Sequence, residues 1–191
     1  TSTSYQTCQD ETEGQVEKEV AVEEDTISEQ GTLEKGREIA GRFSGTLVSA
    51  LSNAIEEKGV AGAVDFCAAH ATNISDSISA VEGVKIQRVS HKPRNPNNAA
   101  NERELELIEQ YMAHREEGTP KPVMVEDNGQ HIFYAPIVIA APLCLNCHGE
   151  PGTDIQPEVH NTIQINYPAD QATGFAMNDL RGLLKITFEE P

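Results

Sequence analysis

The sequence predicts an α+β fold in which an antiparallel sheet is flanked by helices, with a long helix near the N-terminus. Three observations predict it: apolar residues recur at helical spacing in the first half, they alternate in several later segments, and the connections are short. Short connections favour antiparallel pairing of strands with the helices on one face. At 191 residues the chain can build one sizeable core.

The helical part begins with apolar residues spaced by four between about Thr32 and Glu57. This stripe consists of Ile39, Phe43, Leu47, Leu51 and Ile55. Gly59 is expected to end the first helix, and a second helix follows directly. Its apolar face contains Val60, Ala63, Val64, Cys67, Ala71, Ile74 and Ile78, with Cys67 at the centre.

Five strands are expected after these helices. Val84–His91 alternates and ends at a proline-rich turn, and a short helix over Glu102–Arg115 follows it. Pro122–Glu126 and His131–Ala140 form a predicted hairpin, because Asp127-Asn128-Gly129 between them is a turn signal. The remaining strands are expected at Thr162–Tyr167 and Leu183–Phe188.

Residues 1–31 are expected to be an acidic flexible leader, and residues 32–191 a folded domain. Between Thr1 and Glu34 the chain carries ten acidic residues and one basic residue, Lys18. Such a segment buries too little apolar surface to offset the entropy of ordering it. Cys8 lies in this leader and is expected to be free or to form an intermolecular disulfide.

Charge and hydropathy exclude several partners. The formal net charge is −17, so neither a nucleic acid nor an anionic lipid surface is an expected partner. No run of 18 or more apolar residues is present, so we expect no membrane insertion of this chain. The N-terminus lacks the pattern of a signal peptide, and we expect an exported protein whose presequence has been removed.

Cys144, Cys147 and His148 form a Cys-x-x-Cys-His motif, the attachment signature of c-type haem. Two thiols at this spacing can each add to one vinyl group of the same porphyrin, and the adjacent histidine can then bind the iron. Attachment of haem c takes place outside the cytoplasm in bacteria. The motif therefore predicts one covalently attached haem c and an extracytoplasmic location.

A zinc site or a redox dithiol could use the same two cysteines. Zinc normally requires a second pair of ligands at similar spacing, which the chain lacks. A dithiol does not require the adjacent histidine. Haem is therefore the preferred interpretation.

The second axial ligand stays open on spacing alone. The candidates are Cys67, His70, His91, His114, His131, His160, Met112, Met124 and Met177. Cys67 points into the predicted core, where a free cysteine commonly acts as a small apolar residue. His70 lies at the margin of the same helical face.

Four segments resemble a family of single-haem, PAS-like domains that was long catalogued as a domain of unknown function. They are residues 88–99 (RVSHKPRNPNNA), 144–149 (CLNCHG), 167–174 (YPADQATG) and 179–182 (DLRG). The family occurs as a free cyanobacterial haem protein and as the extracytoplasmic part of bacterial sensor kinases. The resemblance covers about Leu33 to Phe188.

The resemblance implies a PAS-like, five-stranded antiparallel sheet and an unusual His/Cys ligation of the iron, with His148 and Cys67 as the two ligands. A thiolate ligand favours the ferric state, so a low reduction potential is expected. Reduction should weaken the thiolate bond and could admit a diatomic ligand.

Arg94, and after it Lys92, could pair with a haem propionate, since a planar guanidinium suits a carboxylate. Arg94 could equally cap the turn between two prolines. Arg181 is expected to stabilise the fold.

Three functions follow from a haem domain of this kind. A redox or small-ligand sensor is preferred, which would signal to a separate chain. A low-potential electron carrier with an unidentified redox partner is the alternative. An enzyme is not expected, because two strong axial ligands leave no site for substrate and no other catalytic motif is present.

Overall fold

A computed structural model describes residues 16–114, 118 and 120–188, with side chains from residue 30 onward. The chain divides into two compact units, Thr1–Lys35 and Gly36–Pro191. Helix α1 begins at Val16, inside the segment predicted as a leader. Cys8 lies outside the described residues, and the predicted flexibility and boundary of residues 1–31 stay predictions.

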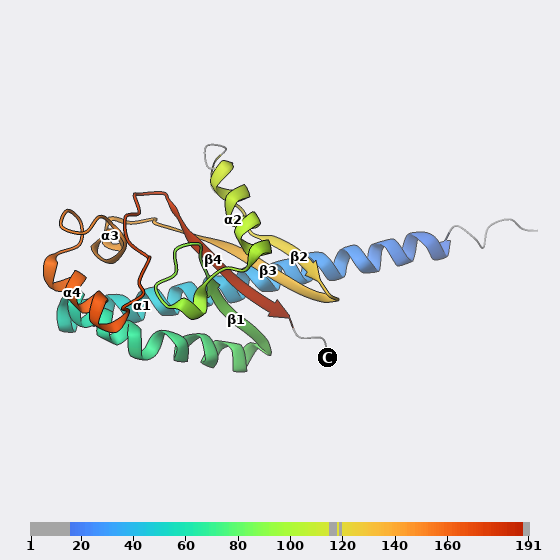
Figure 1. The fold of residues 1–191 in the computed structure, drawn as a ribbon. Coiled ribbons are helices and arrows are strands. Elements are labelled where there is room, and N and C mark those ends of the chain that lie inside the picture. Colours follow the sequence, from blue (N-terminus) through green and yellow to red (C-terminus); the bar gives the residue numbers. More distant parts are fainter. Residues whose placement is uncertain (1–15, 115–117, 119, 189–191) are drawn as a thin grey trace, which may run out of the picture. The chain divides into compact units, whose positions relative to one another are not determined.

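Helix α1 (Val16–Glu82) is interrupted at Gly59, which has φ 73° and ψ 176°. Glycine adopts this conformation without the steric cost that a Cβ would impose. Beyond Gly59 the helix turns back, so that its two arms, residues 36–58 and 60–82, run side by side (Figure 1), and Arg42 pairs with Glu82. The predicted division into two helices at Gly59 is confirmed.

The sheet contains four strands in the order β1-β4-β3-β2, and every pairing is antiparallel. The strands are β1 (Val84–Val89), β2 (Val123–Asp127), β3 (Gln130–Val138) and β4 (Leu180–Phe188). The predicted first strand, hairpin and last strand are therefore confirmed. The 3-10 turn η1 (Pro96–Asn98) and helix α2 (Glu102–Ala113) connect β1 to β2, and α2 has the predicted start.

The prediction of a fifth strand at Thr162–Tyr167 is wrong, because this segment belongs to helix α4 (Pro157–Asn166). Ile163 and Ile165 alternate with polar residues, which suggested a strand. The deciding spacing is instead Val159 to Ile163, four residues apart and both buried, while Ile165 is 69% exposed. Pro157 at the first helical position starts the helix. Helix α3 (Pro142–His148) precedes it.

The two faces of the sheet bury different helices. On one face Val89, Ile132 and Leu183 pack with Ile108 of α2. On the other face the ring of Phe133 lies directly against Gly36 of α1. Ile39 and Phe43, the first residues of the predicted apolar stripe, are fully buried.

Within the described ranges, no helix is both long and apolar enough to cross a membrane.

Candidate haem-attachment site

The Cys-x-x-Cys-His motif occupies helix α3, between Cys144 and its last residue, His148. Pro142 starts the helix, and the N–H of Gly149 closes it by donating to the carbonyl oxygen of Leu145 at 2.9 Å. A Cβ at Gly149 would lie only 2.5 Å from the side chain of Asp154. Glycine is therefore required where the chain leaves His148.

Both motif thiols are free and half-buried, and their i, i+3 spacing places them on the same side of α3. Each contacts a different apolar cluster. Cys144 packs against Ile139, Ala172 and Phe175, together with Leu145 and Met177. Cys147 packs against Val64 of α1 and against Ile155, Val159 and Ile163. The cysteine pair thus lies where two apolar clusters meet.

His148 is oriented by a backbone carbonyl. Its Nδ1 lies 2.8 Å from the carbonyl oxygen of Ala172. Because a carbonyl oxygen only accepts, Nδ1 carries the hydrogen and the lone pair is on Nε2. Burial lowers the pKa of His148 well below its usual value, and the nearby charges of Arg94 and Arg181 lower it further. The neutral imidazole is the form that binds a metal.

The segment that carries Ala172 is itself fastened to α3. Gly174 and Phe175 donate backbone hydrogen bonds to the carbonyl oxygens of Gly149 and His148, at 2.8 and 2.9 Å. The ring of Phe175 meets that of His148 edge-on, with the ring centroids 6.3 Å apart. Residues 172–175 therefore hold the histidine in place.

Arg94 links three parts of the chain. Its Nε lies 3.1 Å from Asp170 Oδ1, and its Nη2 donates to the carbonyl oxygens of Cys147 at 2.6 Å and Ala172 at 3.2 Å. Both side chains of the Arg94–Asp170 pair are well buried. The structure thus shows Arg94 bridging the end of α3 to residues 170–172. These contacts do not test the pairing with a propionate that the sequence suggested for Arg94.

Cys67 lies on the second arm of α1, at the same end of the unit as α3. It is half-buried and free. Burial raises the pKa of the Cys67 thiol, while the charges of Arg88 and Arg94 lower it. Burial also raises the pKa of Cys147, and the charge of Cys67 acts in the same direction. Val64, three residues before Cys67 on this arm, belongs to the cluster on which Cys147 packs. The fold therefore brings the arm that carries Cys67 to the motif, although Cys144 lies 77 positions later in the sequence.

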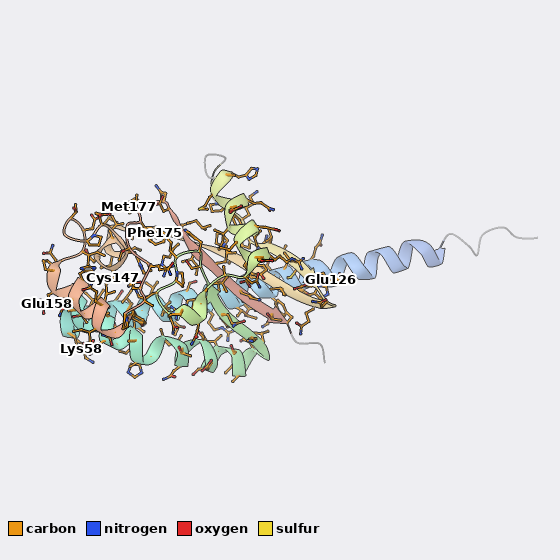
Figure 2. The ribbon with its side chains drawn as sticks, viewed as in Figure 1. Lys58, Glu126, Cys147, Glu158, Phe175 and Met177 are labelled. Atoms are coloured by element: carbon orange, nitrogen blue, oxygen red, sulfur yellow. The ribbon has the colours of Figure 1, made fainter. Side chains whose placement is uncertain are left out.

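The other candidate ligands fall into two groups. His70 is exposed and packs on the ring of Phe66 at 4.7 Å, and His114, His131 and Met112 are also exposed. Met124 and His160 are half-buried, on β2 and α4. Met177 belongs to the cluster around Cys144. In Figure 2, Met177, Phe175 and Cys147 lie at one end of the unit and Glu126 at the other.

His91 was one candidate among many in the sequence, and the structure distinguishes it. Its ring meets that of Phe175 edge-on, with centroids 6.0 Å apart. Its Nδ1 is buried, and among the described side chains it is the one buried nitrogen or oxygen without a hydrogen-bond partner. Burial, together with Arg181 and Lys92, lowers the pKa of His91.

Arg181 stabilises the fold as expected: its Nη1 donates to Ser90 Oγ at 2.8 Å and to the carbonyl oxygen of Lys92 at 3.0 Å. Burial lowers its pKa to about 10. Lys92 Nζ donates to the carbonyl oxygen of Thr173 and lies over the ring of Phe175.

No role was predicted from the sequence for Arg88 on β1. Its position was nevertheless informative, because Val84, Ile86 and Arg88 alternate along the strand and therefore share the face that Val84 and Ile86 bury.

Across the part of the chain with described side chains, no three His, Cys, Asp or Glu residues are grouped as a metal site.

Comparisons with known proteins agree with this fold. A solved structure, the crystal structure of the cyanobacterial heme-protein Tll0287, is similar to this chain with a TM-score of 0.55. The two chains are 24% identical, and the match covers 77% of this chain and 94% of that one. No curated protein matches. The model of the Tll0287-like family matches residues 4–188, and the chain therefore belongs to the Tll0287-like family.

Proposed function

We propose that this chain is an extracytoplasmic c-type haem protein with one haem, attached through Cys144 and Cys147 and ligated by His148 and Cys67. The observation that carries the proposal is the geometry of α3. Two free thiols share one side of the helix, and His148 directs Nδ1 to the Ala172 carbonyl at 2.8 Å. The structurally similar cyanobacterial protein Tll0287 is a heme-protein.

The donor set fits a haem. The two thiols lie where two apolar clusters meet, as an apolar macrocycle requires. His148 presents Nε2 in the neutral form that binds iron. Cys67 supplies a sulfur from a different element at the same end of the unit.

Each residue then has a defined task. In attachment, the sulfur of each motif cysteine bonds to one carbon of a vinyl group and its proton goes to the other carbon, so no group leaves. His148 and Cys67 would hold the iron, and Cys67 would do so as a thiolate. When bound, the haem supplies a one-electron Fe(III)/Fe(II) couple. The thiolate stabilises the ferric state and so lowers the reduction potential.

A redox or small-ligand sensor is the function we favour. We also propose that the sheet is of the PAS-like type. Loss of the Cys67 thiolate on reduction would free a position for a diatomic ligand and release the second arm of α1. The signal would pass to a separate signalling protein. The alternative is a low-potential electron carrier. We do not propose an enzyme, since His148 and Cys67 together would leave the iron no site for a substrate.

Acid-acetone extraction of the purified protein tests the attachment. Thioethers are covalent, so the haem should stay with the chain, and the Cys144→Ala/Cys147→Ala variant should release it. A colourless protein that contains zinc, or haem that extracts from the unaltered chain, would contradict the proposal.

The ferric spectrum and the reduction potential test Cys67. Cys67→Ser should remove the thiolate signature of the low-spin spectrum and raise the potential, because serine does not donate a negative charge to iron at neutral pH. His70→Ala, on the exposed side of the same helix, is the matched control and should change neither. An unchanged spectrum in Cys67→Ser would assign the sixth position to another residue.

Spectra of both oxidation states separate the sensor from the carrier. A sensor should change an axial ligand on reduction. Identical ferric and ferrous ligation, with rapid electron exchange with small donors, would favour the carrier.

A further inference from the structure

Four cationic side chains surround the proposed haem site in a chain whose net charge is −17. They are Lys92, Arg94, Arg181 and Arg88, and the charge of each acts on His148, His91 or Cys67. Three of them have partners within the protein. Arg94 binds Asp170 and two carbonyl oxygens, and Arg181 binds Ser90 and a carbonyl oxygen. Lys92 donates to the carbonyl oxygen of Thr173.

Arg88 differs from these three. Among the described residues it makes no hydrogen bond and no ion pair, and its charge interacts with Cys67, Tyr167, His148 and the cationic Arg181. The Arg88 side chain is half-buried on its strand, and this burial lowers the pKa of the guanidinium. A desolvated charge without a partner is costly, so an anion is expected beside it.

The sheet register directs Arg88 toward the site. Arg88 pairs with Leu184, and Ile86, two residues earlier, pairs with Ile186. Residues two apart on a strand share a face, and direct cross-strand partners share it too. Phe133, which pairs with Ile186, lies on this face against α1. Arg88 therefore projects from the α1 face of β1, toward the arm that carries Cys67.

We propose that Arg88 binds a propionate of the haem and that Arg94 does not. This inference rests on the proposed haem attachment. The planar guanidinium of Arg88 offers several N–H donors in the geometry of a carboxylate, and no described side chain uses them. Arg94 already uses its Nε and Nη2 for Asp170, Cys147 and Ala172, which leaves only Nη1 without a hydrogen bond among the described residues.

The covalent holoprotein provides the first test. In its resonance Raman spectrum, the propionate bending band should shift in Arg88→Gln. It should stay in place in Arg94→Gln and in the exposed control Arg103→Gln. The potential of Arg88→Gln should also fall, because the loss of a positive charge near the haem favours the ferric state. A holoprotein whose band is unchanged in Arg88→Gln, or shifts in Arg94→Gln alone, overturns the inference and leaves haem attachment intact.

A second test uses the full chain with Cys144→Ala/Cys147→Ala and two probes, haem b and haem b dimethyl ester. The ester has the same macrocycle without the charged carboxylates. With Arg88 present, haem b should bind on the order of tenfold to a hundredfold more tightly than the ester, the effect of a charge-assisted hydrogen bond. Arg88→Gln should abolish that preference while binding of the ester is unchanged.

Equal losses for haem b and its ester would mean that Arg88 acts through the Cys67 thiolate or the fold, and would overturn the inference. Failure of the proposed function has a different signature, which is that the unaltered chain carries no haem at all.

Discussion

Two groups of polar side chains, one on the α2 face of the sheet and one around the proposed haem site, differ in whether the protein supplies their partners. On the α2 face, Glu104 is 3% exposed. Its Oε1 accepts from Lys185 Nζ at 2.8 Å and from the Tyr134 hydroxyl at 3.3 Å, and its Oε2 accepts from the N–H of Asn101 at 3.0 Å. The chain itself thus satisfies both carboxylate oxygens.

The group around the proposed haem site is incomplete by contrast. Arg88 has no hydrogen bond or ion pair with a described residue, and the buried His91 Nδ1 has no hydrogen-bond partner there. Polar groups that serve only the fold must find partners in the protein, because an unsatisfied buried group costs free energy. Groups that face a cofactor can leave a partner to be supplied by it. The comparison therefore identifies Glu104 as a structural residue and is the basis for proposing Arg88 as a binding residue.

The largest loss of stability is expected from a change in the group around Glu104, on the α2 face. Glu104→Gln keeps a side chain that can still cap α2 but leaves the Lys185 ammonium, 17% exposed, without its counter-charge. The free energy of unfolding should fall by about 3 kcal/mol, measured by urea denaturation. The double variant Glu104→Gln/Lys185→Met should recover part of this loss. Asp127→Asn, which breaks the exposed pair with Arg103, should cost less than about 1 kcal/mol. A similar cost for the two single variants would contradict the comparison.

A smaller loss is expected where the fold is packed without spare space. In Gly36→Ala the new Cβ would come within 2.5 Å of the Phe133 ring, which is fully buried and cannot move into solvent. Overpacking should cost about 1–3 kcal/mol. Gly45→Ala, at a position on the same helix with nothing within 4 Å, should instead gain up to about 1 kcal/mol from helix propensity. Thermal denaturation of both variants checks the sign.

Alkaline pH should lower the stability of the fold, in part through two tyrosines on the α2 face. Burial raises the pKa of Tyr111 to about 12, and burial together with Glu104 raises the pKa of Tyr134 above its ordinary value of 10. Below pH 10 these groups are protonated in both states. Between pH 10 and 12 the unfolded chain loses protons that the folded chain retains, so stability falls as pH rises. Tyr111→Phe/Tyr134→Phe should reduce that fall in urea titrations at pH 9 to 12. An equal fall of stability in this variant would show that groups other than Tyr111 and Tyr134 cause the pH dependence.

The smallest change in stability is expected from a substitution of His91, near the proposed haem site. His91→Phe keeps a ring against Phe175 and removes the unpartnered Nδ1. The free energy of unfolding should therefore change by less than about 1 kcal/mol, in either direction. A loss as large as that of Glu104→Gln would show that His91 has a structural role.

Local patterns predicted most of the elements. The break at Gly59, the hairpin at Asn128-Gly129 and the start of α2 at Glu102 depend on neighbouring residues only, and all three are confirmed. The strand at Thr162–Tyr167 was wrong, because four alternating residues fit either period. Packing of Val159 and Ile163 against Val64 and Cys147 decided for the helix. That contact joins segments far apart in the chain.

The sequence by itself determined that two thiols and an imidazole lie together on α3, because the spacing of Cys144, Cys147 and His148 is a local property. Only the tertiary structure brought Cys67 to the same end and gave His148 its partner at Ala172. The tertiary structure also distinguished two arginines of the same motif. Arg94 meets Asp170, 76 residues later, whereas Arg88 meets no acidic partner among the described residues. Pairing of this kind depends on which distant segments the sheet and the turn at Gly59 bring together, and no local pattern encodes it.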